Sequence, residues 1–164
     1  PDCRAPGRPA LPRPNSTPNK NTAATAARNA ENKKSAINNH LAIIYPVIEQ
    51  GLKSAGISLG TPFFIEFARV GVINDVNEVI GADLVLILIG ERPGLGVADA
   101  MSAYMGYKPA AGKTDADRDV ICMITRNGGT NPLEGGAFVV ELIKKTLKYQ
   151  ASGVNLKLKS AGES

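Results

Sequence analysis

Residues 84–89 are six consecutive apolar residues, and this run constrains the fold more than any other stretch of the chain. It is too short for a buried helix and has the length of a strand covered on both faces, as in parallel α/β sheets. Ligands of such sheets lie beyond the carboxyl ends of the strands. Glu91 stands at that end, before a turn rich in proline and glycine at 92–96. We therefore expect a binding site at Glu91.

Helix and strand patterns alternate over the rest of the chain. They predict helices at 37–53, at 75–80, at 97–105 and from Pro132, and strands at 62–68, 84–89 and 120–124. Pro46 is expected to kink the first helix or to begin a shorter one. Asn74 and Gly81 are expected to cap and to end the second helix. This order predicts an α/β fold with a Rossmann-like parallel sheet flanked by helices.

The first 36 residues have a different composition from the rest. Six of the first 20 residues are prolines, and the alanine-rich segment that follows lacks large apolar side chains. Such a segment cannot bury enough surface to offset the entropy lost on ordering. We therefore expect a disordered or extended Pro/Ala-rich tail or linker at 1–36 and one domain at 37–164.

Positive charge is concentrated at the start of the chain. Residues 1–40 contain seven Lys or Arg and two acidic residues, whereas residues 41–164 contain 12 and 13. The formal net charge of +4 therefore describes the tail and not the domain. A domain that binds nucleic acid clusters basic side chains on its folded elements. We expect no nucleic-acid partner.

The cysteine and hydropathy patterns are typical of a protein of the reducing cytoplasm. Cys3 and Cys122 make neither a disulfide framework nor a zinc-ligand spacing. No apolar stretch reaches the roughly 18 residues that a membrane-spanning helix needs. We expect a cytoplasmic protein that makes no membrane contact.

Few residues have the spacing of known catalytic or metal sites. The turn after residue 90 lacks both G-x-G-x-x-G and the Walker lysine. His40 has no cysteine or carboxylate at ligand spacing, and the charged stretch 114–119 lacks the glycine and later glutamate of a calcium loop. Cys122 is interpreted as a small buried residue of an apolar run. We predict a solvated charged turn or a helix start at 114–119, no catalytic residue and no metal site.

Two interpretations remain open for each candidate site residue. Glu91 either binds a ligand or pairs with Arg92 in a salt bridge at the sheet edge. Val70 follows the strand predicted at 62–68, and its backbone lies beside Glu91 if that strand neighbours strand 84–89. The simpler interpretation of Val70 is the plain end of a strand.

Four segments of the chain resemble the small subunit of ethanolamine ammonia-lyase. They are GTPFFIEFARV, GADLVLILIGERPGLG, ADRDVICMITRNGGTNPLEGGAFVVEL and ASGVNLK, within residues 37–156. The most specific parts are GERPGL after the apolar run and the late ASGVN. The resemblance implies adenosylcobalamin as the cofactor. It also implies the conversion of ethanolamine to acetaldehyde and ammonia, a reaction that needs the large subunit.

The resemblance places the cobalamin contacts of the family at Val70, Glu91 and Cys122. Alignment on the ADR motif instead puts Val120 at the cysteine position of the family, two residues before Cys122. These contacts imply non-covalent binding of the corrin ring, chiefly through hydrogen bonds from its amides to Glu91 and to backbone groups. The cofactor supplies the radical chemistry, so the resemblance implies no catalytic residue in this chain.

The resemblance further implies a hetero-oligomer with the large subunit, located in the cytoplasm within a bacterial microcompartment. The alternative interpretation is a truncated homologue that acts as a non-catalytic scaffold or interaction protein. A free-standing α/β enzyme that acts on a nucleotide is disfavoured, because the phosphate-binding motifs are missing.

Overall fold

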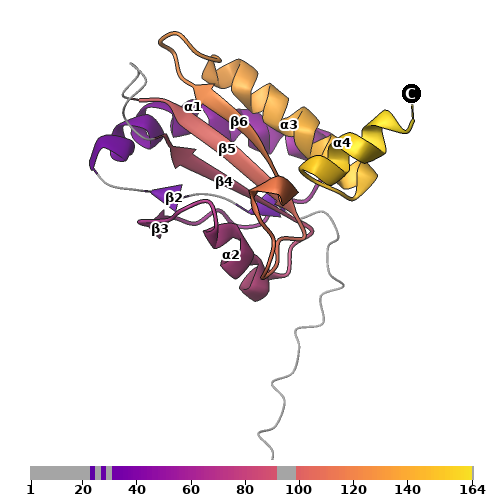
Figure 1. Cartoon of the computed structure of the whole chain (residues 1–164). Coiled ribbons are helices and arrows are strands. Elements are labelled where there is room, and N and C mark those ends of the chain that lie inside the picture. The colour runs from indigo at the N-terminus through magenta and orange to yellow at the C-terminus, as the bar shows by residue number, and fades with distance from the viewer. Residues whose placement is uncertain (1–22, 25–26, 29–30, 92–98, 164) are drawn as a thin grey trace, which may run out of the picture.

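The computed structural model describes residues 23–24, 27–28, 31–91 and 99–163, with side chains from residue 36 (Figure 1). The strands are β1 (Ala23–Ala24), β2 (Ala27–Arg28), β3 (Ile65–Glu66), β4 (Leu84–Gly90), β5 (Met101–Tyr107) and β6 (Arg118–Ile124). The helices are α1 (Glu31–Ser54), α2 (Val72–Ile80), α3 (Pro132–Tyr149) and α4 (Val154–Ala161), with a short 3-10 helix η1 (Asp115–Asp117).

The main sheet has the strand order β1-β4-β5-β6. β4 pairs antiparallel with β5, and β5 pairs antiparallel with β6. The two-residue strand β1 runs parallel to β4, and β2 pairs with β3 in a separate small parallel sheet. The predicted Rossmann-like parallel sheet is therefore wrong, because the three long strands of the described chain form an antiparallel meander.

The connection between β4 and β5 explains this correction. Residues 91–100 join the two strands, whereas a parallel pair needs a crossover of about a dozen or more residues, usually a helix. The sequence prediction placed that helix at 97–105, but residues 101–107 form β5 and residues 97–98 lie outside the described part. The strand predicted at 84–89 is confirmed as β4, and all of its residues are buried.

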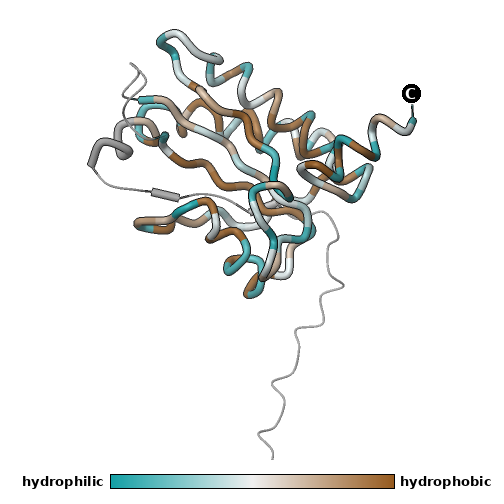
Figure 2. The backbone as a smooth tube through the Cα atoms, viewed as in Figure 1, coloured by the Kyte–Doolittle hydropathy of each residue, from teal (hydrophilic) through white to brown (hydrophobic). Residues whose placement is uncertain are grey.

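Helices cover β4 on both faces, which accounts for its unbroken apolar run (Figures 1 and 2). On the inner face, side chains of β4 and β5 pack with α1 and α3; they include Leu84, Leu86, Leu88, Met101, Met105, Ile44, Ile48 and Ile143. On the outer face, Val85 and Ile87 pack with Ala68 and with Ile73 of α2. A strand thus needs two covered faces, and not a parallel sheet, to be apolar throughout.

Close contact between α1 and α3 depends on two glycines. A Cβ atom at Gly136 would lie 2.8 Å from Val47 Cγ1, and one at Gly51 would lie 2.7 Å from Val140 Cγ2. Larger side chains at these two positions would force the helices apart. The two glycines therefore leave room for Val47 and Val140 at the contact between α1 and α3.

Several helix predictions are confirmed, with changed ends. Pro46 lies inside one continuous helix, α1, which begins at Glu31 within the segment assigned to the tail. The domain boundary at residue 37 stays a prediction, since residues 1–22 are outside the described part. Gly81 ends α2 in the left-handed conformation, as expected, and Pro132 opens α3. Helix α4 was not predicted.

Two local predictions are corrected by competing contacts. Gly71, and not Asn74, is the N-cap of α2, and the Asn74 side-chain amide instead donates to the Lys113 carbonyl at 3.0 Å. The strand predicted at 62–68 is reduced to the two residues of β3. Phe67 follows β3 with a φ of 55°, a left-handed conformation in which a strand cannot continue.

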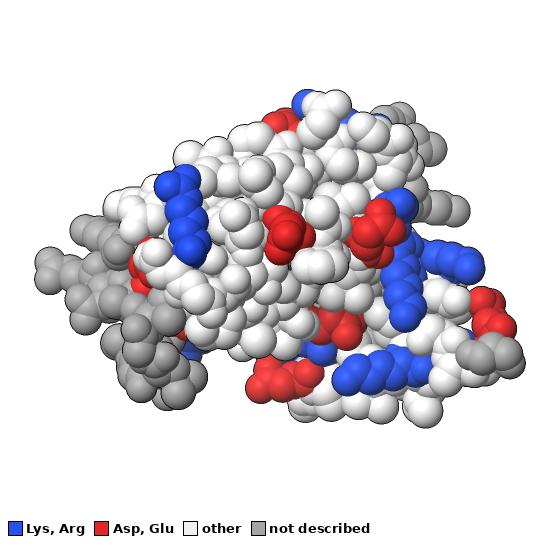
Figure 3. Space-filling view, turned by 90° about the horizontal axis from the view of Figure 1, so that it is seen from above, with Lys and Arg blue, Asp and Glu red and all other residues white. Residues whose placement is uncertain are grey.

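The described surface carries mixed charge on the face seen in Figure 3. Basic and acidic side chains are interspersed there over a largely uncharged surface. This distribution agrees with the near-neutral charge of residues 41–164. No helix in the described ranges has the length and apolar character needed to cross a membrane.

Candidate functional site

Glu91 directly follows β4 and is half-buried. Its backbone N–H donates to the Ala100 carbonyl at 2.9 Å, which extends the β4–β5 ladder by one residue. Its Oε1 atom accepts hydrogen bonds from Ser102 Oγ at 2.5 Å and from the Met123 backbone N–H at 2.8 Å. Among the described residues no hydrogen bond reaches Oε2. One oxygen therefore fixes the carboxylate, and the other can accept a hydrogen bond from a ligand.

The Met123 N–H reaches Glu91 because β6 contains a bulge. The β5–β6 register shifts at this point, so that Cys122 and Met123 together oppose Ser102. Met123 has a φ of 55°, and a non-glycine residue in a sparsely populated conformation costs about 1–3 kcal/mol. Bulges re-aim backbone and side-chain groups beside binding sites. Here the bulge directs an N–H away from the strand ladder and onto the carboxylate.

Three side chains form a partly open strip on the outer face of the sheet, next to Glu91. We call Tyr104, Val120 and Cys122 the outer strip. Tyr104 is half-buried and pairs across the strands with Val120, whose exposed fraction is 44%. Cys122 is exposed, so its interpretation as a buried residue is wrong. Both alternatives for the cysteine position of the family therefore lie on the accessible part of β6.

Sequence reasoning missed Ser102 and Tyr104 because both fall in the range interpreted as a helix. Side chains two residues apart on a strand share a face. The serine that holds Glu91 and the tyrosine of the outer strip are therefore neighbours along β5. An interpretation of residues 101–107 as a strand, with side chains alternating between two faces, would have placed Ser102 and Tyr104 on the same face.

Val70 lies in the turn before α2 and is half-buried, with its carbonyl accepting the Ile73 N–H at 3.3 Å. The backbone of Val70 is not brought beside Glu91 by neighbouring strands, because β3 pairs with β2 and not with β4. The segment nevertheless covers part of the outer face, since Ala68 and Ile73 pack in one cluster with Tyr104. Val70 thus borders the same face as the outer strip, and its ligand contact stays a prediction.

Asp99, the first described residue after segment 92–98, is also held, by His40 and Thr125. His40 is 1% exposed, and its Nε2 lies 2.8 Å from the Asp99 carbonyl oxygen and 3.4 Å from Asp99 Oδ2. Thr125 Oγ1 donates to Asp99 Oδ1 at 3.2 Å. The two residues that flank segment 92–98 are therefore both anchored to the sheet and helix layers. Arg92 lies in that segment, outside the described residues.

The charged stretch 114–119 is a helix start only in its first part. Residues 115–117 form η1 with Thr114 as N-cap, whereas Arg118 and Asp119 begin β6. Thr114 and Asp117 make a reciprocal capping box around η1, and Asp115 pairs with Arg118. Asp119 Oδ2 accepts the Gly153 N–H at 2.7 Å. The carboxylates of this stretch thus have structural partners. Over the described ranges no three His, Cys, Asp or Glu residues gather in a group able to hold a metal ion.

The pKa of the Tyr104 hydroxyl is raised above its usual 10.0, first by burial and then by the negative charges of Glu91, Asp115 and Cys122. The folded state therefore holds this proton more tightly than the unfolded chain does. The contribution of the protonated Tyr104 hydroxyl to the free energy of unfolding is fully present below the unfolded-state pKa. It is lost as pH rises through the folded-state pKa. At neutral pH the hydroxyl is a hydrogen-bond donor at the centre of the outer strip.

We expect Tyr104→Phe to remove one late-titrating group from an alkaline titration of tyrosinate absorbance. It should also reduce the loss of stability above the ordinary pKa of 10.0. Tyr45→Phe should also remove a late-titrating group, because burial and Glu49 raise the pKa of Tyr45 on helix α1. Glu91→Gln separates the two groups, since it should lower the pKa of Tyr104 and leave that of Tyr45 unchanged. If Tyr104→Phe instead removes a group that titrates at the ordinary pKa of 10.0, neither burial nor Glu91 raises the pKa of Tyr104.

Comparison with known proteins identifies the family. A family model described as ethanolamine ammonia-lyase light chain (EutC) matches residues 33–157. The ethanolamine ammonia-lyase small subunit of Fusobacterium nucleatum is 51% identical over 113 residues, which are 69% of this chain and 38% of that protein. The small subunit of Clostridium perfringens is 48% identical over 122 residues, 74% of this chain and 41% of that protein.

The corresponding subunit of Clostridium tetani is 46% identical over 115 residues, 70% of this chain and 39% of that protein. The chain therefore spans about two fifths of the length of these curated relatives. The matched region runs from α1 to α4 and includes Glu91, Ser102 and the outer strip. The chain belongs to the ethanolamine ammonia-lyase light-chain family.

Proposed function

We propose that this chain is the cobalamin-binding part of an adenosylcobalamin-dependent ethanolamine ammonia-lyase. Together with a large subunit it would convert ethanolamine to acetaldehyde and ammonia. Family membership supports this reaction, and the anchored carboxylate of Glu91 beside the outer strip is the structural observation that carries the proposal. Family membership alone supports the large subunit as partner and a bacterial microcompartment as location.

The residues of the site fit this cofactor chemically. The corrin ring is a broad, largely apolar disc whose rim bears amide side chains. Val120 and the ring of Tyr104 offer apolar surface, and Glu91 Oε2 can accept an amide N–H at the margin. A hydrogen bond to a charged acceptor contributes about 1.5–3 kcal/mol. When bound, the cofactor supplies the radical chemistry, and this chain positions it and covers one side.

Ser102 and the Met123 N–H have a positioning role in this proposal. Both hydrogen bonds fall on the same oxygen of Glu91, so the carboxylate cannot rotate without losing them. A preorganised acceptor loses less side-chain entropy when a ligand binds. Ser102→Ala should therefore weaken cofactor binding less than Glu91→Ala, because it loosens the acceptor without removing it.

The test is ethanolamine-dependent acetaldehyde release in the presence of adenosylcobalamin. This chain alone, a cognate large subunit alone, and the mixture are compared. We expect activity in the mixture only. Glu91→Ala should weaken cofactor affinity about tenfold or more, as read from the cobalamin absorbance of the isolated complex. Glu78→Ala, which removes an exposed carboxylate from α2, is the matched control.

Two outcomes would contradict the proposal. If Glu91→Ala and Glu78→Ala bind the cofactor equally well, the anchored carboxylate is not a cofactor contact. If a folded chain restores no activity to the large subunit, the scaffold interpretation is favoured.

A further inference from the structure

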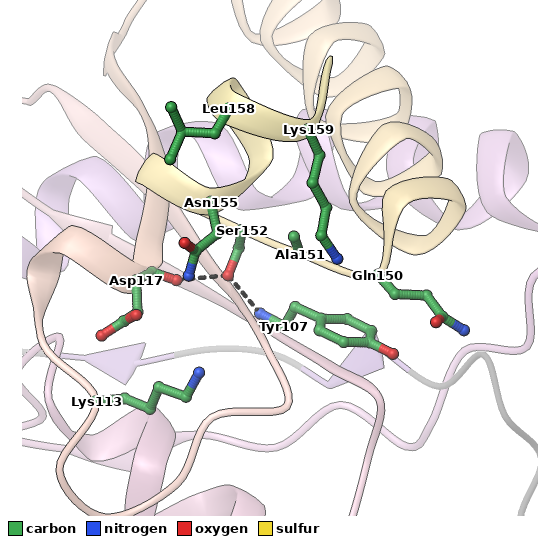
Figure 4. A pocket seen from close by; sticks show the side chains of 9 residues that line it. All are labelled: Tyr107, Lys113, Asp117, Gln150, Ala151, Ser152, Asn155, Leu158 and Lys159. Carbon is green, nitrogen blue, oxygen red and sulfur yellow. Dashed lines mark hydrogen bonds between the residues drawn. The ribbon is translucent and has the colours of Figure 1, made fainter. Parts of the chain in front are cut away.

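A pocket of about 250 Å³ lies at the end of the sheet opposite to Glu91. Figure 4 shows the side chains that line it. Tyr107 lines it and pairs with Leu84, the first residue of β4, whereas Glu91 follows the last residue of that strand. The other walls come from Lys113, from the α3–α4 junction and from α4. We call it the α4 pocket. It is separate from the site proposed for the cofactor.

The floor of the α4 pocket is held by hydrogen bonds and close packing. Ser152 is 5% exposed; its Oγ accepts the Tyr107 N–H at 2.8 Å and donates to the Asp117 carbonyl at 2.5 Å. A Cβ atom at Gly153 would lie 2.0 Å from the Ala116 carbonyl oxygen. Three segments distant in sequence are thus locked together below the pocket. The polar walls are therefore carried by a backbone that has little freedom to move.

The charged side chains around the pocket are mainly basic. Lys113 and Lys159 enter from opposite sides, and the Asp117 carboxylate points away from Ser152 (Figure 4). Asp117 Oδ2 is occupied by the Thr114 N–H at 2.9 Å. Asn155 of α4 adds an amide. The interior thus offers cationic and amide donors, with the one lining carboxylate turned elsewhere.

Lys159, one of the two lysines of the pocket, also has a structural role. Lys159 Nζ donates to the Tyr149 carbonyl at 3.1 Å, near the C-terminal end of α3, where a cation is favourable. An ammonium group has three donors, so two remain for a ligand. For Lys113, the described hydrogen bonds within the protein involve its backbone N–H and carbonyl and not its ammonium group. Capping of α3 therefore does not explain why Lys113 faces the same pocket.

We propose that the α4 pocket binds a small organic anion, whose carboxylate or phosphate group lies between the Lys113 and Lys159 ammonium groups. The volume of 250 Å³ has room for about eight water-sized groups, which limits the ligand to a small metabolite. Leu158 and the ring of Tyr107 provide apolar surface for a short carbon chain. Compact ammonium groups bind phosphate and carboxylate as point charges.

The test follows backbone amide shifts of residues 150–159 in the isotope-labelled full chain during separate titrations with inorganic phosphate and propionate. We expect saturable shifts with at least one anion, and the anion that binds more tightly identifies the ligand group. Lys113→Met should weaken binding about tenfold, the loss of one charge-assisted contact. Lys157→Met, on the same helix but not among the lining residues, should leave it unchanged.

Lys159→Met is a second variant whose stability must be measured alongside binding, because it also removes the bond to the Tyr149 carbonyl. Lys113→Met does not carry this complication. Shifts that fail to saturate with either anion, or that saturate equally in Lys113→Met and Lys157→Met, would overturn the proposal. The titration uses neither cobalamin nor a large subunit, so its result is independent of the proposed lyase function.

Discussion

Gly153→Ala is expected to lower the free energy of unfolding by about 2–6 kcal/mol, from backbone strain and overpacking together. Gly153 has φ 65° and ψ −136°, a conformation that residues with a side chain rarely adopt. Its added Cβ would also lie 2.0 Å from the Ala116 carbonyl oxygen, a backbone atom that cannot turn aside as a side chain would. Such a loss is a large part of the roughly 5–15 kcal/mol that stabilises a typical protein.

Urea denaturation of Gly153→Ala and of Gly112→Ala would separate the two causes. Gly112 has a φ of 85° but nothing within 4 Å of an added Cβ, so its substitution introduces backbone strain alone. We expect Gly112→Ala to cost about 1–2 kcal/mol. Equal losses for the two variants would mean that the close approach of Gly153 to Ala116 does not contribute to stability. The packing argument for a rigid floor of the α4 pocket would then be wrong.

Leu88→Ala is expected to cost about 2–5 kcal/mol, the range for removing a buried leucine from a packed core. Leu88 is 0% exposed and packs on the inner face between the sheet and helices α1 and α3. The close contact of those helices leaves little room for the site to collapse around the cavity. A fall in the urea midpoint with an unchanged m-value would report this loss.

Val120→Ala is the matched control on the outer face of the same sheet. Val120 is 44% exposed, so its substitution should change stability by less than about 1 kcal/mol. The contrast would show that the outer strip adds little to the stability of the isolated chain. Comparable losses at Leu88 and Val120 would instead mean that another part of the molecule covers the outer strip.

The position of Glu91 at the end of a buried strand could be predicted from the sequence because one strong signal determines it. Six apolar residues bounded by Asp83 and Gly90 specify a buried strand, and Glu91 necessarily follows its end. The helix of residues 132–149 was predictable for a similar reason, since Pro132 and a long apolar stripe mark it. An unbroken apolar run and a proline before an apolar stripe are signals in the local sequence, so they hold whichever way the strands pair. The rule that made this strand end a binding site applies to parallel sheets, and the antiparallel pairing of β4 removes that support.

The pairing direction of the strands could not be predicted in the same way. Met101 and Met105 are four residues apart, a spacing that fits one face of a helix as well as one face of a strand. Pairing with β4 decides between them, and that contact is not local. The hydrogen bond from the Met123 N–H to Glu91 could not be predicted either, because it depends on a bulge whose backbone conformation no residue pattern specifies.

The hydrogen bonds of Ser152 also bear on the order in which the chain folds during synthesis. The Tyr107 N–H and the Asp117 carbonyl share a partner that lies 45 and 35 residues later in the chain. Because synthesis proceeds from the N-terminus, β4, β5 and β6 emerge before the residue that joins them at this end. A nascent chain that stops within α3 leaves a backbone donor and acceptor without their partner, which costs about 1–3 kcal/mol for each buried group. Such incomplete chains should open at this end of the sheet and become early substrates for proteases.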